Sequence, residues 1–461
     1  MSVALLSIQS EIVQERRYDR PNFPNPSLGA LFSYLKKNNV ACSVIDTKLE
    51  RLSLPETIQA LERIQPSIIG FTSFTHEIER VAFAAGVIKN KFPEAKYIIG
   101  GSHANAIPKE LLSEFPVFDI AVFGEGEETL LELVKNNCNN LQRIDGIAYR
   151  NGQGVFLNRA RSPLDLRTLP VIDWTPFRRA RYYPVFTSRG CHYRCIFCVK
   201  TFGATVRYRL TQDIVEEMKQ IKKLFHPRIY YFWDENLCAN RERTLELMER
   251  IRKENALKGV RWFCMAHVNN LDYALLKAMK SSGCRRFGFG VESGSEAIMS
   301  KLGKSITKEK INQVAAWAKQ LKMPFEGYFM LGLPDENWKT CMETIRYAAR
   351  LNPTYPVFGI VVPFPGTALH AMAQRNQGGY RIIARGWSDY NRIIGKAIEL
   401  KDLSRRQLEL LQSIAYMSVL VRNFRIVSMV RFFFQFYIDI GSYIRNFLAN
   451  NRHSENNTVR S

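Results

Sequence analysis

Short runs of apolar residues alternate with longer amphipathic stretches through most of this 461-residue chain. Continuous apolar runs are typical of strands that are covered on both faces, and the amphipathic stretches between them suit crossover helices. The alternation therefore predicts an α/β fold in which parallel sheets carry helices on their faces. It occurs twice, over residues 3–135 and again, with a longer period, over 183–375.

The first series predicts a doubly wound, Rossmann-like parallel sheet over residues 1–140. Its strands are expected at Val3–Ile8, Cys42–Asp46, Ser67–Thr72, Tyr97–Gly101 and Phe118–Phe123. Its helices are expected at Leu28–Lys37, Pro55–Ile64, Glu77–Lys89 and Glu127–Val134. Ligands of such sheets bind at the carboxyl ends of the strands. Turns of small and polar residues stand at those ends, namely Thr72-Ser73, Gly100-Gly101-Ser102-His103 and Gly124-Glu125-Gly126-Glu127.

Residues 141–182 are predicted to form a hairpin and a Pro- and Arg-rich linker. The hairpin strands are expected at Gly146–Arg150 and Val155–Asn158. Six further strands are expected at Pro184–Ser188, Ile229–Trp233, Val260–Met265, Arg286–Glu292, Phe325–Leu331 and Val357–Val362. Six strand–helix units over 183–375 are too few for an eightfold barrel, so we predict an open, partial barrel with its site at the carboxyl-end loops.

Residues 376–461 are predicted to be a helical C-terminal region that ends in a disordered polar stretch after Asn450. An amphipathic helix is expected at 424–448, where large apolar residues recur at helical spacing. Such a helix packs on the barrel or lies in the headgroup layer of an anionic membrane. The second alternative would suit a lipid or isoprenoid substrate.

Three of the nine cysteines form a tight cluster, Cys191-His-Tyr-Arg-Cys195-Ile-Phe-Cys198, directly after the first barrel strand. Three thiolates in eight residues can hold one metal centre from a single loop. Structural zinc is one alternative, although closed zinc sites have four ligands. A 4Fe–4S cluster is the other; with only three thiolates it keeps one iron open.

This pattern of cysteines after the first strand of a partial barrel resembles the radical S-adenosylmethionine (SAM) superfamily. The resemblance implies that Cys191, Cys195 and Cys198 hold a 4Fe–4S cluster whose open iron binds SAM. It extends to Trp233-Asp234-Glu235-Asn236, Gly288-Phe-Gly-Val-Glu292-Ser-Gly294, Gly327-Tyr-Phe-Met-Leu-Gly332-Leu-Pro334 and Pro363-Phe-Pro-Gly366. The SAM contacts that it implies are Phe197, Asp234, Glu292 and Gly332. The superfamily's Gly-Gly-Glu after the second strand is replaced here by Asp234-Glu235-Asn236.

The N-terminal turns resemble the cobalamin-binding domain that is fused to some radical SAM barrels. The resemblance covers about residues 1–375 and is to the branch with anaerobic magnesium-protoporphyrin ester cyclases and carbon or phosphorus methyltransferases. The cobalamin contacts that it implies are Thr72, Ser73, Gly100, Gly101, His103, Gly124, Glu125 and Gly126. The Asp-x-His-x-x-Gly motif that supplies a lower axial histidine is absent, so cobalamin is expected to bind without histidine under cobalt. The alternative is a domain that has lost cobalamin and kept its fold.

These cofactors imply an enzyme that cleaves SAM to a 5′-deoxyadenosyl radical and methylates an unactivated carbon of a small or lipid-like substrate. Radical cyclisation or rearrangement with the same cofactors is the second hypothesis. A non-catalytic cobalamin sensor and a zinc-bound structural protein are the others. An electron donor such as flavodoxin or ferredoxin is the expected partner. The N-terminal cysteines of tRNA methylthiotransferases are missing, so no nucleic-acid partner is expected.

The net charge of +22 suits a basic soluble surface, nucleic acid or an anionic membrane, and does not choose among them. The scattered cysteines indicate a reducing compartment rather than a disulfide framework. The N-terminus has no features of a signal peptide, and no run of 18 uncharged apolar residues is present. We therefore expect a cytoplasmic protein, with peripheral membrane contact through 424–448 as the alternative for its tail.

Overall fold

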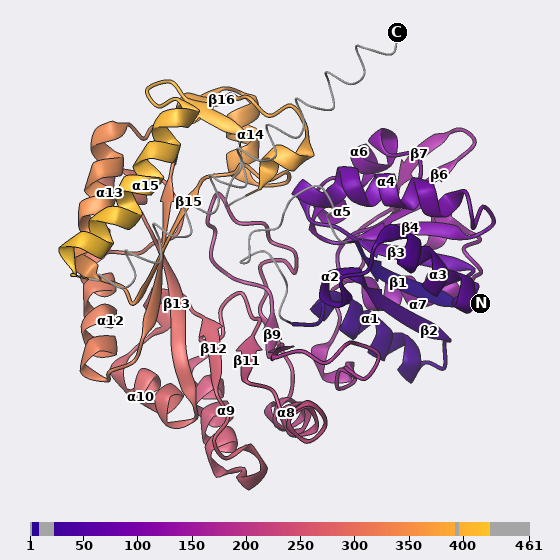
Figure 1. The fold of residues 1–461 in the computed structure, drawn as a ribbon, viewed down its shortest axis with the longest axis horizontal. Helices are drawn as coiled ribbons and strands as arrows, with labels where there is room; N and C mark the ends of the chain where they lie inside the picture. The colour runs from indigo at the N-terminus through magenta and orange to yellow at the C-terminus, as the bar shows by residue number, and fades with distance from the viewer. Residues whose placement is uncertain (1, 9–22, 392–395, 425–461) are drawn as a thin grey trace, which may run out of the picture.

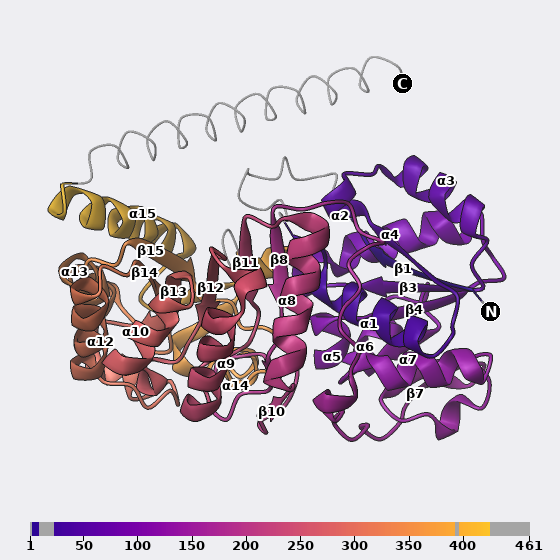
Figure 2. The ribbon, with the colours of Figure 1, turned by 90° about the horizontal axis from the view of Figure 1, so that it is seen from below.

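The computed structural model describes residues 2–8, 23–391 and 396–424. These residues form two lobes that lie side by side (Figures 1 and 2). The N-terminal lobe is a sheet with helices on both faces, and the second lobe is an open, curved sheet with its helices on the outside. The α/β fold predicted from the alternation of apolar and amphipathic stretches is confirmed.

Within the described residues, the N-terminal sheet has seven strands in the order β2-β1-β3-β4-β5-β6-β7. The first five are parallel: β1 (Val3–Ser7), β2 (Cys42–Asp46), β3 (Ile68–Thr72), β4 (Lys96–Gly100) and β5 (Ile120–Val122). The strand order reverses between β1 and β3, and ligands of such sheets bind at the carboxyl side of that switch point.

The predicted hairpin is present as β6 (Ile147–Asn151) and β7 (Gly154–Leu157), but it belongs to the N-terminal sheet rather than to the linker. Ile147 pairs antiparallel with Val122, so β6 covers the edge that β5 would otherwise expose. A hairpin can be predicted from its turn residues alone. The sheet edge that accepts it depends on contacts between distant segments, which is why the sequence placed it in the linker.

Helices cover both faces of this sheet because successive strand residues point to opposite sides. Val3 and Leu5 share one core with α1 (Pro26–Lys37) and α7 (Gly126–Lys135). Ala4 and Leu6 share the other core. The helices on that side are α3 (Leu54–Ile64), α4 (Ile78–Lys89) and α6 (Pro108–Glu114). Short helices α2 (Thr47–Glu50) and α5 (Ser102–Ala106) follow β2 and β4. The doubly wound arrangement is confirmed.

The second lobe holds the six predicted parallel strands, with ends shifted by a few residues. In the part of the chain that the structure describes, their order is β15-β14-β13-β12-β11-β8. They are β8 (Tyr182–Val185), β11 (Ile229–Phe232), β12 (Trp262–Met265), β13 (Cys284–Glu292), β14 (Phe325–Leu331) and β15 (Tyr355–Ile360). The outer strands β8 and β15 do not pair with each other, so this is an open barrel.

Five longer helices connect the barrel strands, in agreement with the sequence pattern. They are α8 (Thr211–Phe225), α9 (Arg241–Lys253), α10 (Tyr273–Ser281), α12 (Lys308–Gln320) and α13 (Trp338–Leu351), with a short α11 (Glu296–Met299) after β13. The predicted first strand is shorter than expected. The chain leaves the barrel after Val185 and forms β9 (Ser188–Arg189), which pairs antiparallel with β10 (Arg207–Tyr208).

The C-terminal region is only partly helical, contrary to the prediction for 376–461. After α14 (Ala368–Gln374), strands β16 (Tyr380–Ile382) and β17 (Ile398–Leu400) form a small antiparallel sheet. Helix α15 (Arg405–Arg422) then packs on α13 and β15. Except for Phe424, the predicted amphipathic helix at 424–448 lies outside the described residues.

Candidate active site

The three clustered cysteines lie in the loop that connects β9 to β10. Arg189 and Arg207 are partners in this ladder, so they close the loop at its base. Cys191 and Cys195 are half-buried and Cys198 is exposed. All nine cysteines of the chain lie in the described residues, and all are free thiols. The loop therefore presents three unbridged sulfur ligands near the carboxyl end of the barrel.

Partial removal of water from around the sulfur atoms raises the pKa of all three thiols, to about 11 for Cys198. Charge on Cys191 raises the pKa of both other thiols further, so the three sulfur atoms lie near one another. Among the described residues, no three His, Cys, Asp or Glu side chains converge on a single metal ion. A cuboidal cluster takes each thiolate at a different iron atom. The donor set therefore fits such a cluster, whose binding would displace the thiol protons.

Glu292 lies beside this loop at the end of β13, in a left-handed backbone conformation with φ of 65°. Its buried carboxylate pairs with Lys304, whose Nζ also donates to the carbonyl oxygen of Gly290 at 2.7 Å. The Lys304 ammonium lowers the pKa of Cys195. The structure thus brings Glu292 close to the cysteines, as predicted, together with a lysine that the sequence analysis missed. No motif marks Lys304, since its partner lies twelve residues away along the chain.

Asp234 is buried, and its carboxylate is occupied by barrel hydrogen bonds. It accepts from the Thr187 hydroxyl at 2.8 Å and from the Ser188 hydroxyl. These bonds hold the end of β11 against the segment that leads into the cysteine loop. The neighbouring Glu235 is exposed, and its charge raises the pKa of Cys191 and Cys198. Glu235 is therefore the freer carboxylate beside the loop, whereas the sequence analysis had selected Asp234.

Gly332 forms the turn after β14 with φ of 88°, a conformation that favours glycine. Its N–H donates to Glu336 at 2.8 Å, and its carbonyl oxygen accepts from the Tyr380 hydroxyl at 2.9 Å. Glu336 also accepts from the N–H of Leu333 at 3.0 Å. Burial raises the pKa of Glu336 to about 7, although these donors favour its ionised form. Glu336 was not predicted as a site residue. The signal that could have identified it is its position as a carboxylate four residues after the Gly332 turn.

Aromatic residues flank the cysteine loop. Phe197 is half-buried and packs against the main hydrophobic core. Tyr193 stacks on His267 with ring centroids 3.4 Å apart and donates from its hydroxyl to Asn270 at 2.9 Å. Burial and the Lys304 charge lower the pKa of His267 to about 3, so its ring is neutral. His267 was also missed from the sequence, because a single histidine at a strand end carries no motif.

The carboxyl ends of β3 and β4 meet as predicted. The Ser73 N–H donates to the Gly100 carbonyl oxygen at 3.1 Å. Gly101 has φ of 96°, and a Cβ there would lie 2.5 Å from the Ser73 carbonyl oxygen and 2.9 Å from the Thr72 hydroxyl. Only glycine fits this turn, because a side chain there would collide with the segment that follows β3. Gly101 therefore keeps the ends of β3 and β4 close together at the edge where ligands of such sheets bind.

His103, in contrast, is fully buried and turned toward the C-terminal region. Its ring lies 4.7 Å from the Trp387 ring, and neither ring nitrogen has a hydrogen-bond partner among the described residues. Burial lowers its pKa to about 4, so the ring is neutral. Trp387 is itself held by Glu114, which accepts from the indole N–H at 2.9 Å. The predicted cobalamin contact thus packs between the N-terminal lobe and the C-terminal region.

Glu125 joins the two lobes. Its carboxylate binds Arg189 Nη1 at 2.6 Å through one oxygen and Arg207 Nη1 at 2.6 Å through the other. The second oxygen also accepts from the Leu164 N–H at 2.8 Å. Arg189 makes a further ion pair with Glu127 at 2.6 Å. Both carboxylate oxygens of Glu125, which we predicted as a cobalamin contact, are therefore bound to the base of the cysteine loop.

Gly124 and Gly126 lie on either side of Glu125 in the turn that leads into α7. The Gly124 N–H donates to the Asn105 side chain at 2.6 Å, and Gly126 begins α7 next to Leu31. The roles of these residues, and of the other selected positions, as cofactor contacts stay predictions.

Comparison with known proteins agrees with this division of the chain. Residues 22–134 match the B12 binding domain family, and residues 185–348 match the radical SAM superfamily. The chain combines a B12-binding domain with a radical SAM domain. The edge at Gly101 lies in the first of these domains, and the cysteine loop lies in the second.

Two curated relatives share most of this domain pair. An uncharacterised methyltransferase of Pyrococcus horikoshii is 28% identical over 86% of this chain and 88% of that protein. An anaerobic magnesium-protoporphyrin IX monomethyl ester cyclase of Rubrivivax gelatinosus is 26% identical over 75% of this chain and 65% of that protein. Among solved structures, the radical SAM methyltransferase TsrM of Kitasatospora setae superposes with a TM-score of 0.75 and 16% identity. That match covers 91% of this chain and 89% of TsrM, and it supports the fold of both domains together.

Proposed function

We propose that this radical SAM protein is a cobalamin-dependent methyltransferase that acts on an unactivated carbon of a small or lipid-like substrate. One observation carries the proposal most directly: both ends of the cysteine loop are tied to Glu125, at the carboxyl edge of the B12-binding domain. The two regions suited to cofactors are therefore held together by one buried carboxylate.

When bound, the cluster and SAM supply a 5′-deoxyadenosyl radical for hydrogen abstraction, and cobalamin supplies the methyl group. Cys191, Cys195 and Cys198 would hold the cluster through their three thiolates. Lys304, which pairs with Glu292, places its ammonium group near Cys195. The Gly101 turn lies at the sheet edge that we propose would bind the corrinoid. His103 is not proposed as a cobalt ligand, because it is buried against Trp387.

Radical cyclisation is the second candidate, favoured by the similarity to the ester cyclase of Rubrivivax gelatinosus. Methyl transfer and cyclisation consume SAM differently. A radical methyltransferase yields both 5′-deoxyadenosine and S-adenosylhomocysteine, because one SAM supplies the radical and another the methyl group. A cyclase yields only 5′-deoxyadenosine.

The test is anaerobic turnover of SAM by reduced protein that has been supplied with cobalamin, with quantification of both products. We expect 5′-deoxyadenosine and S-adenosylhomocysteine from the wild type, and neither from Cys195→Ala. Cys42→Ala is the matched control, since Cys42 lies in β2, outside the cysteine loop. Formation of 5′-deoxyadenosine alone would favour the cyclase. Absence of both products from cluster-loaded protein would contradict the proposal.

The chemistry also requires an electron donor, for which a flavodoxin or ferredoxin is our proposal. In the portion of the chain covered by the structure, no helix is long and apolar enough to cross a bilayer. We propose a cytoplasmic location and a small-molecule or lipid substrate. Peripheral membrane contact through 424–448 is a further proposal. Reduction assays can test the electron donor, and vesicle binding can test the membrane contact.

A further inference from the structure

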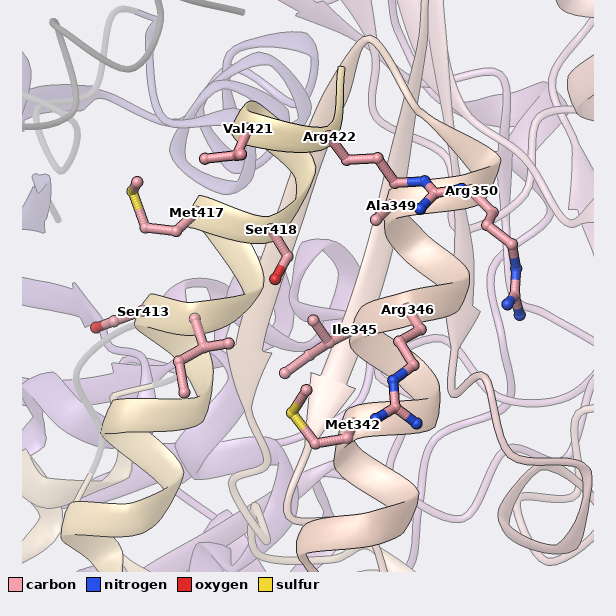
Figure 3. Close-up of a pocket in the computed structure, with 11 residues that line it drawn as sticks. Met342, Ile345, Arg346, Ala349, Arg350, Ser413, Met417, Ser418, Val421 and Arg422 are labelled. Carbon is pink, nitrogen blue, oxygen red and sulfur yellow. The ribbon is translucent and has the colours of Figure 1, made fainter. Parts of the chain in front are cut away.

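An open groove of about 860 Å³ lies between α13 and α15 on the outside of the barrel (Figure 3). Figures 1 and 2 place both helices at the end of the molecule that is remote from the N-terminal lobe. The cysteine loop is tied to that lobe through Glu125. The groove is therefore separate from the candidate active site.

The floor of the groove is apolar. Ile345 and Ala349 of α13 are buried, and Met342 and Ser418 point into the space between the helices (Figure 3). At the C-terminal end of α15, Val421 remains 53% exposed. An apolar surface of this kind is expected to bind an apolar group. The volume lies within the range of about 300–1,000 Å³ that is usual for ligand pockets.

Three arginines line the groove: Arg346 and Arg350 of α13, and Arg422 at the end of α15. The Arg422 side chain extends toward α13, whereas the Arg350 side chain extends away from α15 (Figure 3). All three are exposed, and none forms an ion pair with any described residue. On α9, by comparison, Arg250 and Arg252 pair with glutamates one turn away. The groove thus combines an apolar floor with three uncompensated positive charges, which suits a ligand that is apolar at one end and anionic at the other.

The residues that follow the groove in the chain are apolar enough for its floor but lack the anionic part of this chemistry. Residues 425–448 lie outside the described structure, and their sequence holds three arginines and one aspartate. A basic segment would bring like charges to a basic rim. Charge complementarity therefore favours an external anion over the chain's own C-terminal segment.

We propose that the α13–α15 groove binds an anionic phospholipid of a membrane surface. Acyl carbons would contact Met342, Ile345 and Ala349, the phosphate would lie near the guanidinium groups of Arg346 and Arg422, and Arg350 would add positive charge at the rim. Guanidinium groups bind phosphate through paired N–H donors and stay charged at any physiological pH. The site would dock the barrel on an anionic leaflet, and it does not depend on the reaction that the enzyme catalyses.

The test is co-sedimentation of the full-length protein with vesicles of phosphatidylcholine alone or of phosphatidylcholine mixed with phosphatidylglycerol. The wild type is expected to bind only the mixed vesicles. Replacing Arg346, Arg350 and Arg422 together with Gln should weaken that binding by about tenfold or more, since each basic residue near an anionic surface contributes to the free energy of binding. The matched control replaces Arg51, Arg63 and Arg143 with Gln. These are exposed arginines of the N-terminal lobe without an ion pair among the described residues.

A second pair of variants tests the apolar part of the groove. Val421→Glu places a carboxylate at the rim and should weaken binding to the mixed vesicles. Leu224→Glu makes the same kind of change at a residue of α8 that is 55% exposed. It should bind as the wild type does. Thermal unfolding of each variant establishes that the chain is folded.

Three results would overturn the proposal. Equal loss in both arginine variants would mean that binding follows net charge alone. Unchanged binding in both would place the membrane contact elsewhere, for example in residues 425–461. Absence of wild-type binding to phosphatidylglycerol would exclude an anionic phospholipid as the occupant.

Discussion

Glu125 is the residue whose replacement should disturb the molecule most strongly outside the cysteine loop. Glu125→Gln leaves Arg189 and Arg207 buried with one carboxylate fewer. Removing one partner of a buried ion pair costs about 3 kcal/mol of unfolding free energy. Chemical denaturation should show this loss. Asp165→Asn, which removes an exposed partner of Arg167, should change the unfolding free energy little. Equal losses of unfolding free energy in the two variants would contradict a stabilising role for the ion pairs of Glu125.

The same carboxylate predicts how stability changes in acid. Burial alone would raise the pKa of Glu125, but Arg189 and Arg207 together lower it below its ordinary value. Its contribution to stability is therefore complete above the unfolded pKa, near 4.3, and is lost as the pH falls through the folded pKa. Below that range, the wild type and Glu125→Gln should converge in unfolding free energy.

Glu336 predicts the opposite pH dependence in a different range. Because burial raises its pKa to about 7, the folded state holds a proton that the unfolded state has already released. Stability should therefore fall as the pH rises from about 4.5 to about 7, by at most about 3 kcal/mol. Glu336→Gln, whose amide oxygen can still accept from the N–H groups of Gly332 and Leu333, should remove this slope. An unchanged slope in the variant would show that another group is responsible.

For single residues, the sequence predicts metal ligands better than it predicts the hydrogen-bond and ion-pair partners of buried carboxylates. The cysteine triad could be found because its spacing is local. Asp234 and Glu125 were selected as cofactor contacts, but their oxygens are occupied by Thr187, Ser188, Arg189 and Arg207. These partners come from segments 46 to 82 residues away, and no sequence pattern reveals them.

Among the helices and strands, α15 is expected to stabilise the fold through the face that it buries against the barrel. Leu411 is fully buried between α15 and the barrel, whereas the adjacent Leu410 is 52% exposed. Leu411→Ala should lower the unfolding free energy by about 2–5 kcal/mol, because it leaves a cavity in a close-packed core. Leu410→Ala should cost less than about 1 kcal/mol. Denaturation of the two variants compares them directly, and equal losses would mean that α15 is not anchored on the barrel through Leu411.

The periodicity of apolar residues predicted nearly every strand and helix of the two sheets, because those elements are long and regular. It failed where short segments are stabilised by distant contacts. The strand pair β16–β17 is three residues long on each side, and its partners lie 16 to 20 residues apart. The hairpin β6–β7 was recognised, but its place in the N-terminal sheet depends on pairing with β5.

In the whole molecule, the two lobes are joined by two sets of contacts. Glu125 and Glu127 bind the base of the cysteine loop. Trp387 packs on His103 and donates hydrogen bonds to Glu79 of α4 and Glu114 of α6. The sequence predicted two domains in this order, but it did not predict the contacts between them. Those contacts set the position of the cysteine loop relative to the carboxyl edge of the N-terminal sheet.

The central claim is that one chain holds both an iron–sulfur cluster and a corrinoid, and metal analysis of anaerobically isolated protein tests it most directly. Protein produced with a supply of cobalamin should contain about four iron atoms, a matching amount of sulfide and about one cobalt per chain. Gly101→Leu should lose the cobalt and keep the iron, because a side chain there collides with Ser73 and Thr72. Zinc without sulfide, or protein that never retains cobalt, would contradict the account.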